Sequence, residues 1–149
     1  ADNRLSALFL TIIIGIEKPA SPDTAESGHM RAVNALFCLV LLLFAVVQYN
    51  DPDFFFWFVL YGLAALWCGL AAAMPEVLTT HGILRASFLL CLIGALIGTV
   101  YYWPTGKAWW MKDVIWNDEA VREGLGMVII TAGLLSVSIT WWLREEATA

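Results

Sequence analysis

Residues Phe54–Met74 read FFFWFVLYGLAALWCGLAAAM, an apolar run that contains no Asp, Glu, Lys, Arg or His. A helix of about 20 residues crosses a hydrocarbon core of about 30 Å. Inside that core every backbone N–H and C=O needs a partner in its own segment, which favours a helix for an isolated apolar run. The stretch therefore predicts a transmembrane helix.

Three further runs share this property, namely Ala32–Gln48, Ala86–Trp103 and Leu125–Leu143. The composition agrees, because 60% of the residues are hydrophobic and only 14% are charged, with a mean hydropathy of +0.75. A soluble domain carries about 25% charged residues. We therefore predict an all-α integral membrane protein, in which residues 30–149 form a four-transmembrane-helix bundle built as two antiparallel hairpins.

Four crossings divide the connections between the two sides of the membrane. Loop one (Tyr49–Asp53) and loop three (Pro104–Gly124) share one side, and loop two (Pro75–Arg85) shares the other side with both termini. Positive residues favour the cytoplasmic side. More of them lie on the side of the termini (Arg4, Lys18, Arg31, Arg85, Arg144) than opposite (Lys107, Lys112, Arg122). We expect a multi-pass protein of a bacterial inner membrane with cytoplasmic termini.

Residues 1–29 form a separate N-terminal extension in this scheme. Leu5–Ile16 is apolar but too short to span a membrane. Lys18–Gly28 reads as a polar linker by its composition. Since ordering a residue costs roughly 1–2 kcal/mol, an ordered extension needs a surface to lie on. We expect that surface to be another subunit.

Aromatic and small residues indicate how the bundle meets its surroundings. Tryptophan concentrates at membrane–water interfaces, and small residues let helix backbones approach closely in lipid. The expected interface anchors are Trp57, Trp103, Trp109, Trp110, Trp116, Trp141 and Trp142. The expected helix-packing positions are Gly62, Gly69, Gly94, Gly98, Gly126 and Gly133.

Two polar segments lie where the second and fourth helices begin. In QYNDPD (residues 48–53), Asp51 suits the N-cap and Pro52 the first helical position. Before the fourth helix, Asn117 or Asp118 suits the N-cap. Capping alone is a sufficient explanation for these residues.

A functional explanation exists beside it, because loops one and three share a side. The polar residues Asn50, Asp51, Asp53, Glu119 and Glu123 would then line one mouth of the bundle. Carboxylate oxygens suit a hard cation, and clustered carboxyls suit proton chemistry. A cation or a lipid-like molecule is the expected ligand of such a mouth.

The sequence lacks the residues that several other classes of function require. The two histidines, His29 and His81, lie outside the predicted spans, and no ionisable residue lies within one, whereas ion pathways usually have one. Cys38, Cys68 and Cys91 lie in apolar runs as packing residues. We predict no catalytic residue, metal or cofactor, and no nucleic-acid partner, because the chain has no basic run and a net charge of −5.

The sequence resembles the transmembrane protein 220 family. The resemblance lies in NALF (34–37), QYNDPD (48–53), Trp57, Tyr61, EGL (123–125) and VIITA (128–132). It implies a small polytopic membrane protein and transfers no catalytic residue. It also implies that the regions around residues 50–53 and Glu123 form the characteristic face of the family.

Two functional hypotheses follow. The first is a non-catalytic accessory or scaffold subunit of a larger membrane complex, whose partners are the lipid bilayer and other membrane subunits. It is motivated by the absent intramembrane chemistry and by the extension. The alternative is a membrane-embedded site, binding or enzymatic, for a cation or lipid-like ligand at the acidic mouth.

Overall fold

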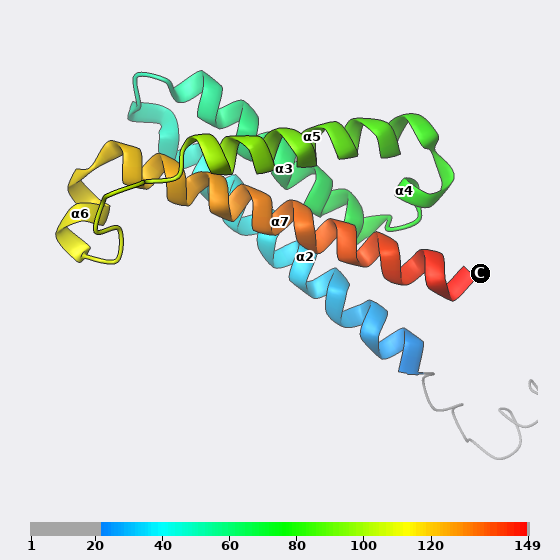
Figure 1. Cartoon of the computed structure of the whole chain (residues 1–149). Coiled ribbons are helices and arrows are strands. Elements are labelled where there is room, and N and C mark those ends of the chain that lie inside the picture. The colour runs from blue at the N-terminus through cyan, green and yellow to red at the C-terminus, as the bar shows by residue number, and fades with distance from the viewer. Residues whose placement is uncertain (1–21, 149) are drawn as a thin grey trace, which may run out of the picture.

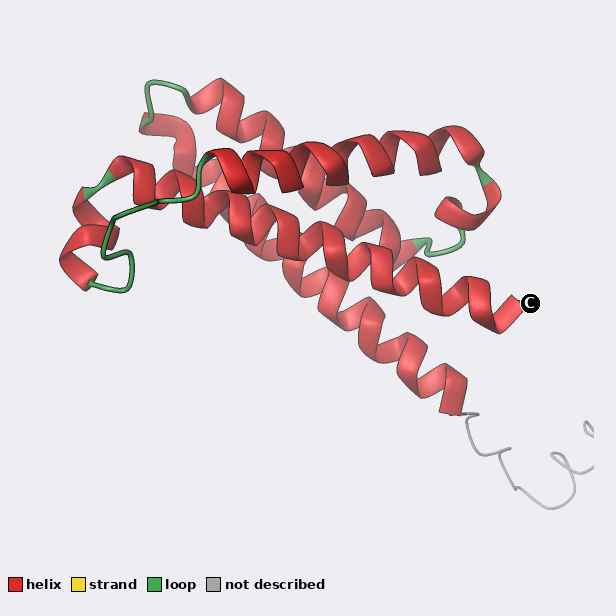
Figure 2. Ribbon diagram, viewed as in Figure 1, coloured by secondary structure: helices red, strands yellow, loops and turns green. Residues whose placement is uncertain are grey.

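The protein is a bundle of long helices, described by a computed structural model over residues 22–148 (Figures 1 and 2). The long helices are α2 (Pro22–Val47), α3 (Phe54–Ala73), α5 (Gly82–Tyr101) and α7 (Glu119–Thr148). The short ones are η1 (Gln48–Asn50), α4 (Val77–Thr80) and α6 (Lys112–Asn117). Within the described residues, four helices are long and apolar enough to cross a membrane, which confirms the predicted all-α class with four transmembrane helices. The stretch Leu5–Ile16 lies outside these residues.

Three long helices begin earlier than the apolar runs that predicted them. α7 begins at Glu119 rather than near Leu125, and α5 begins at Gly82 rather than Ala86. α2 begins at Pro22, so the second half of the predicted polar linker is helical instead. A hydropathy criterion stops at the first charged residue, whereas a helix continues through charged residues at the membrane boundary.

Helix α7 is the most enclosed element of the bundle. Its most apolar window is 56% buried, whereas that of α5 is 11% buried. α7 packs against α2, α3 and α5, while α2 packs most extensively against α3 (Figure 1). α5 therefore depends mainly on α7 for its place in the bundle.

Hydroxyl and amide groups join α7 to two of its neighbours. Asn34 of α2 is fully buried; its Nδ2 donates to Thr140 Oγ1 at 2.7 Å, and its Oδ1 accepts from Ser136 Oγ at 2.6 Å. On the other side, the hydroxyls of Thr99 and Thr131 lie 2.8 Å apart and link α5 to α7. Hydrogen bonds between polar side chains of different helices hold the helices together in lipid, where the hydrophobic effect between helices is weak.

The glycines expected at packing positions fall into two groups. A Cβ at Gly133 would lie 3.1 Å from Leu41 Cδ1, and one at Gly69 would lie 3.3 Å from Cys38 Sγ. A Cβ at Gly98 would overlap the Met127 side chain. Gly62 and Gly94, in contrast, have no neighbouring atom within 4 Å of that position, so neither makes a close contact between helices in the described part of this chain.

Replacing Asn34 with alanine should destabilise the bundle by about 1–2 kcal/mol, because Ser136 and Thr140 of α7 lose their interhelical partner. Unfolding in mixed micelles measures this change. Ser138→Ala is the matched control, since the Ser138 hydroxyl bonds to Leu134 O of its own helix. Equal stability of the two variants would show that the α2–α7 hydrogen bonds do not hold the helices together.

Candidate functional site

Loop one contains a short turn that moves the start of α3 beyond the predicted cap. The 3-10 turn η1 ends at Asn50, and the backbone of the next residue, Asp51, is extended at φ −79° and ψ 142°. A residue before proline is pushed towards this conformation. α3 then begins at Phe54, with Asp53 as its N-cap residue. The predicted capping role of Asp51 is therefore wrong, because Asp53 occupies the N-cap position.

Loop three ends in the cap that the sequence predicts for α7. Asp118 Oδ1 accepts the backbone N–H of Val121 at 3.3 Å, so Asp118 is the residue that caps the helix. Asp118 Oδ2 accepts from Lys107 Nζ at 2.6 Å. The hydrogen bond from Lys107 lowers the pKa of the Asp118 carboxyl, which stays charged as the cap. This bond also closes the segment that carries α6.

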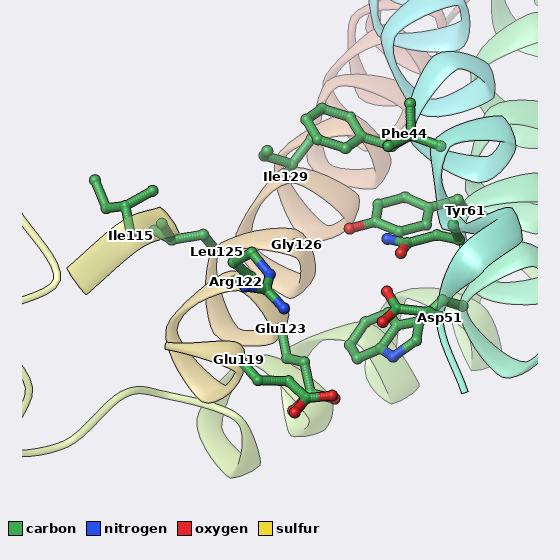
Figure 3. A pocket seen from close by; sticks show the side chains of 13 residues that line it. Phe44, Asp51, Tyr61, Ile115, Glu119, Arg122, Glu123, Leu125, Gly126 and Ile129 are labelled. Carbon is green, nitrogen blue, oxygen red and sulfur yellow. The ribbon is translucent and has the colours of Figure 1, made fainter. Parts of the chain in front are cut away.

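Loops one and three lie at the same end of the bundle, and a cavity of about 400 Å³ lies between them. Its walls come from the end of α2 with η1, the start of α3, α6 and the start of α7. The lining residues are Phe44, Val47, Gln48, Asp51, Trp57, Tyr61, Ile115, Glu119, Arg122, Glu123, Leu125, Gly126 and Ile129 (Figure 3). Three of the five residues predicted for the polar mouth, Asp51, Glu119 and Glu123, are among them.

The charged residues gather at one end of this cavity. Glu119 and Glu123 extend from the first turns of α7 and face Asp51 across the opening, with Arg122 beside them (Figure 3). Glu123 lies close enough to Glu119 and Asp51 to feel their charges. The Trp57 side chain is also close enough to act on the Glu123 carboxyl.

Aromatic rings form much of the remaining wall. The rings of Phe44 and Tyr61 stack with centroids 5.6 Å apart, and Trp57 lies 6.1 Å from Tyr61. The Gln48 side chain interacts with the Tyr61 hydroxyl. Leu125 and Ile129 of α7 add aliphatic side chains to the lining. The cavity thus joins an aromatic and aliphatic inner part to a charged rim.

Two residues predicted for the mouth do not line the cavity. Asn50 and Asp53 are exposed. Asp53 still contributes to the electrostatics of the rim, because its charge acts on Glu123 and on the Tyr102 hydroxyl. Among the described residues, no group of three or more His, Cys, Asp or Glu side chains is arranged to hold a metal ion.

The predicted interface anchors occupy different environments. Trp57 is only 3% exposed, so it is a core residue rather than an anchor. Trp103, Trp109, Trp110 and Trp142 are exposed, and the first three form a chain of ring contacts in loop three. Trp141 is half-buried and lies under Arg85, whose Cζ is 4.2 Å from the ring centroid. Trp116 belongs to α6, and its side chain lies outside the part of the chain that the structure describes.

Sequence reasoning did not assign Phe44, Gln48 or Tyr61 to the site. Phe44 and Tyr61 lie inside apolar runs, where nothing in the sequence distinguishes a cavity wall from a lipid-facing or core position. Gly126 was expected as a packing glycine, and a Cβ there would overlap the Tyr61 hydroxyl. This glycine therefore leaves the space that the Tyr61 ring occupies at the cavity wall.

Gly126→Ala should destabilise the protein by about 1–3 kcal/mol, because the Tyr61 ring is stacked on Phe44 and cannot shift away freely. Gly62→Ala should be neutral or slightly stabilising, because its Cβ meets open space and alanine favours the helix. Thermal unfolding in detergent compares the two variants. Equal losses in both would mean that the Gly126–Tyr61 contact is not tight.

Comparison with known proteins places the chain among membrane proteins. The model of a family described as transmembrane family 220, helix, matches residues 40–139. The match includes loop one, loop three and every residue that lines the cavity, and it confirms the resemblance found in the sequence. No solved structure matches the chain.

Proposed function

The chain belongs to transmembrane family 220, and we propose that it is a non-catalytic binding protein for an amphiphilic molecule at the membrane boundary. One observation carries this proposal, the cavity of about 400 Å³ between loops one and three. Ligand pockets typically measure about 300–1,000 Å³ and combine apolar walls with a few polar groups. This cavity has that composition.

The polarity of the cavity follows the depth of the membrane. Phe44 precedes Gln48 by about one helical turn, and Ile129 follows Glu123 by nearly two turns. Both apolar residues therefore lie deeper in their helices than the polar residues at the rim. An amphiphile in a bilayer has the same division, with its apolar body in the hydrocarbon and its polar head at the interface.

The two ends of the cavity contribute differently to binding. Lipid tails are as apolar as leucine, so a hydrocarbon chain gains little hydrophobic free energy by leaving the bilayer for the cavity. Contacts of the polar head with Asp51, Glu119, Arg122 and Glu123 then provide most of the selectivity. The apolar wall mainly orients the ligand.

Val47→Trp should block the cavity, since Val47 lines it yet is 61% exposed, which lets the larger ring fit without disturbing the core. The measurement is saturable photolabelling of the full chain in nanodiscs by a diazirine-bearing alkyl chain, supplied as the amine and as the alcohol. We expect labels on the cavity wall of the wild type and a loss of about tenfold in the variant.

Val46→Trp is the matched control. Val46 is 64% exposed, adjacent in sequence and not part of the cavity. Its labelling should equal that of the wild type. Labelling that is not saturable with either probe, or that falls equally in both variants, would contradict an amphiphile-binding function.

A second candidate function is that of an accessory or scaffold subunit of a larger membrane complex. The supporting observation is the exposure of α5, which packs mainly on α7 and leaves Gly94 in open space. Copurification from a mild detergent tests this function. A monodisperse lone monomer from the native membrane would count against it.

We further propose a bacterial inner membrane as the location, with cytoplasmic termini. The support is the position of Arg31, Arg85 and Arg144 at the end of the bundle opposite loops one and three. A cysteine introduced at the exposed Thr105 of loop three should react with a membrane-impermeant maleimide in intact cells. Labelling only after the cells are broken would contradict this orientation and place loop three on the cytoplasmic side.

A further inference from the structure

The charge of the rim and the size of the cavity together indicate which polar head the cavity takes. We infer that the ligand carries an ammonium group, alkylated or primary, on an apolar body. This inference rests on the proposed function, since it names the ligand class of the same cavity. The charge of the rim supports a cationic head, and the volume of the cavity with its apolar wall supports an organic one.

The rim has a net negative charge. Asp51, Glu119 and Glu123 oppose the single guanidinium of Arg122, which leaves a formal charge of −2 among the lining residues. Asp53, just outside the lining, adds to the same negative potential at Glu123. A site at the edge of a low-dielectric region strengthens the attraction for an opposite charge. An anionic head would be repelled by the carboxylates.

The aromatic rings belong to the apolar part of the site. Trp57 and Tyr61 line the cavity with only 3% and 2% of their surfaces exposed, and the Phe44 ring stacks on Tyr61. The ammonium group would therefore lie beside the carboxylates of the rim, and the hydrocarbon body would lie against Phe44.

The volume and the apolar wall favour an organic cation over a bare ion. A cavity of about 400 Å³ holds a whole head group together with part of a hydrocarbon chain. The ammonium group can belong to a zwitterionic lipid or to a free amphiphilic amine, and Arg122 is compatible with both. In the lipid, the Arg122 guanidinium would face the phosphate next to the ammonium. With the free amine, it would remain a positive charge at the rim.

The test compares two probes on the full chain in detergent micelles. One probe is decyltrimethylammonium, and the other is its neutral isostere with a tert-butyl head on the same chain. Competition with the photolabelling alkyl amine gives the relative affinity. We expect the carboxylates of the rim to make the ammonium probe bind about tenfold more tightly than the isostere, and this preference to shrink as salt is added.

Variants assign the preference to the cavity. Glu123→Gln should reduce the ratio between the two probes, because it removes one of the three carboxylates of the rim. Phe44→Leu should leave the ratio unchanged, because Phe44 lies at the apolar end of the cavity. Glu76→Gln is the matched control, because Glu76 precedes α4 at the other end of the bundle. It should leave the ratio unchanged. The comparison of probes on the wild type decides the question even where a variant fails to fold.

Nanodiscs distinguish the two sources of the ammonium group. Competition by phosphatidylcholine but not by phosphatidylglycerol would support the inference with a lipid head group as the ligand. Competition by neither lipid, with the ammonium preference retained, would support it with a free amphiphilic amine. Equal binding of the two probes, or stronger competition by phosphatidylglycerol, would overturn the ammonium head and leave the amphiphile site standing. Absence of saturable binding by both probes would overturn the amphiphile site itself.

Discussion

Close approach of helix α7 to its neighbours is the constraint on which the rest of this structure depends. In lipid, apolar side chains gain little by moving from tails to other helices, so small residues and hydrogen bonds determine which helices pack together. α7 presents both kinds of residue, with Gly133 against Leu41 and Ser136 against Asn34. These contacts fix the height of α7 in the bundle. They thereby fix where its first turns, with Glu119 and Glu123, meet loop one.

The cavity forms because this close packing stops before the helices reach the membrane boundary. Near Gly126, the Tyr61 ring replaces backbone contact between α3 and α7. Beyond that point α2 and α7 enclose a space that α6 partly covers through Ile115. Loop three is held over this end by the bond between Lys107 and Asp118. The same features that end the core therefore create a site with an apolar interior and a charged rim.

The sequence predicted the helices well and the site only in part. Apolar runs free of charge identify all four spans, because lipid imposes that pattern directly. Their ends were misplaced, since Glu119 and Arg85 lie inside helices that continue through the boundary. The even number of membrane crossings correctly predicted that Asp51 lies at the same end of the bundle as Glu119 and Glu123. The cap assigned to Asp51 did not hold, because the extended residue before Pro52 delays α3 to Phe54.

The aromatic wall could not be predicted from the sequence. Trp57 resembles an interfacial anchor by its position, yet it is buried and lines the cavity. Which face of a uniformly apolar helix points inward depends on the neighbouring helices, and α3 is apolar all round. Gly62 and Gly126 likewise look equivalent as small residues, although only Gly126 has a neighbour in its Cβ position.

A density map of the full chain, purified from its native membrane in a mild detergent, tests the central claim most directly. The account predicts elongated density between α2 and α7, with its polar end beside Glu123 and its apolar end beside Phe44 and Ile129. Direct contact between the Phe44 and Ile129 side chains, with no density between them, would contradict it.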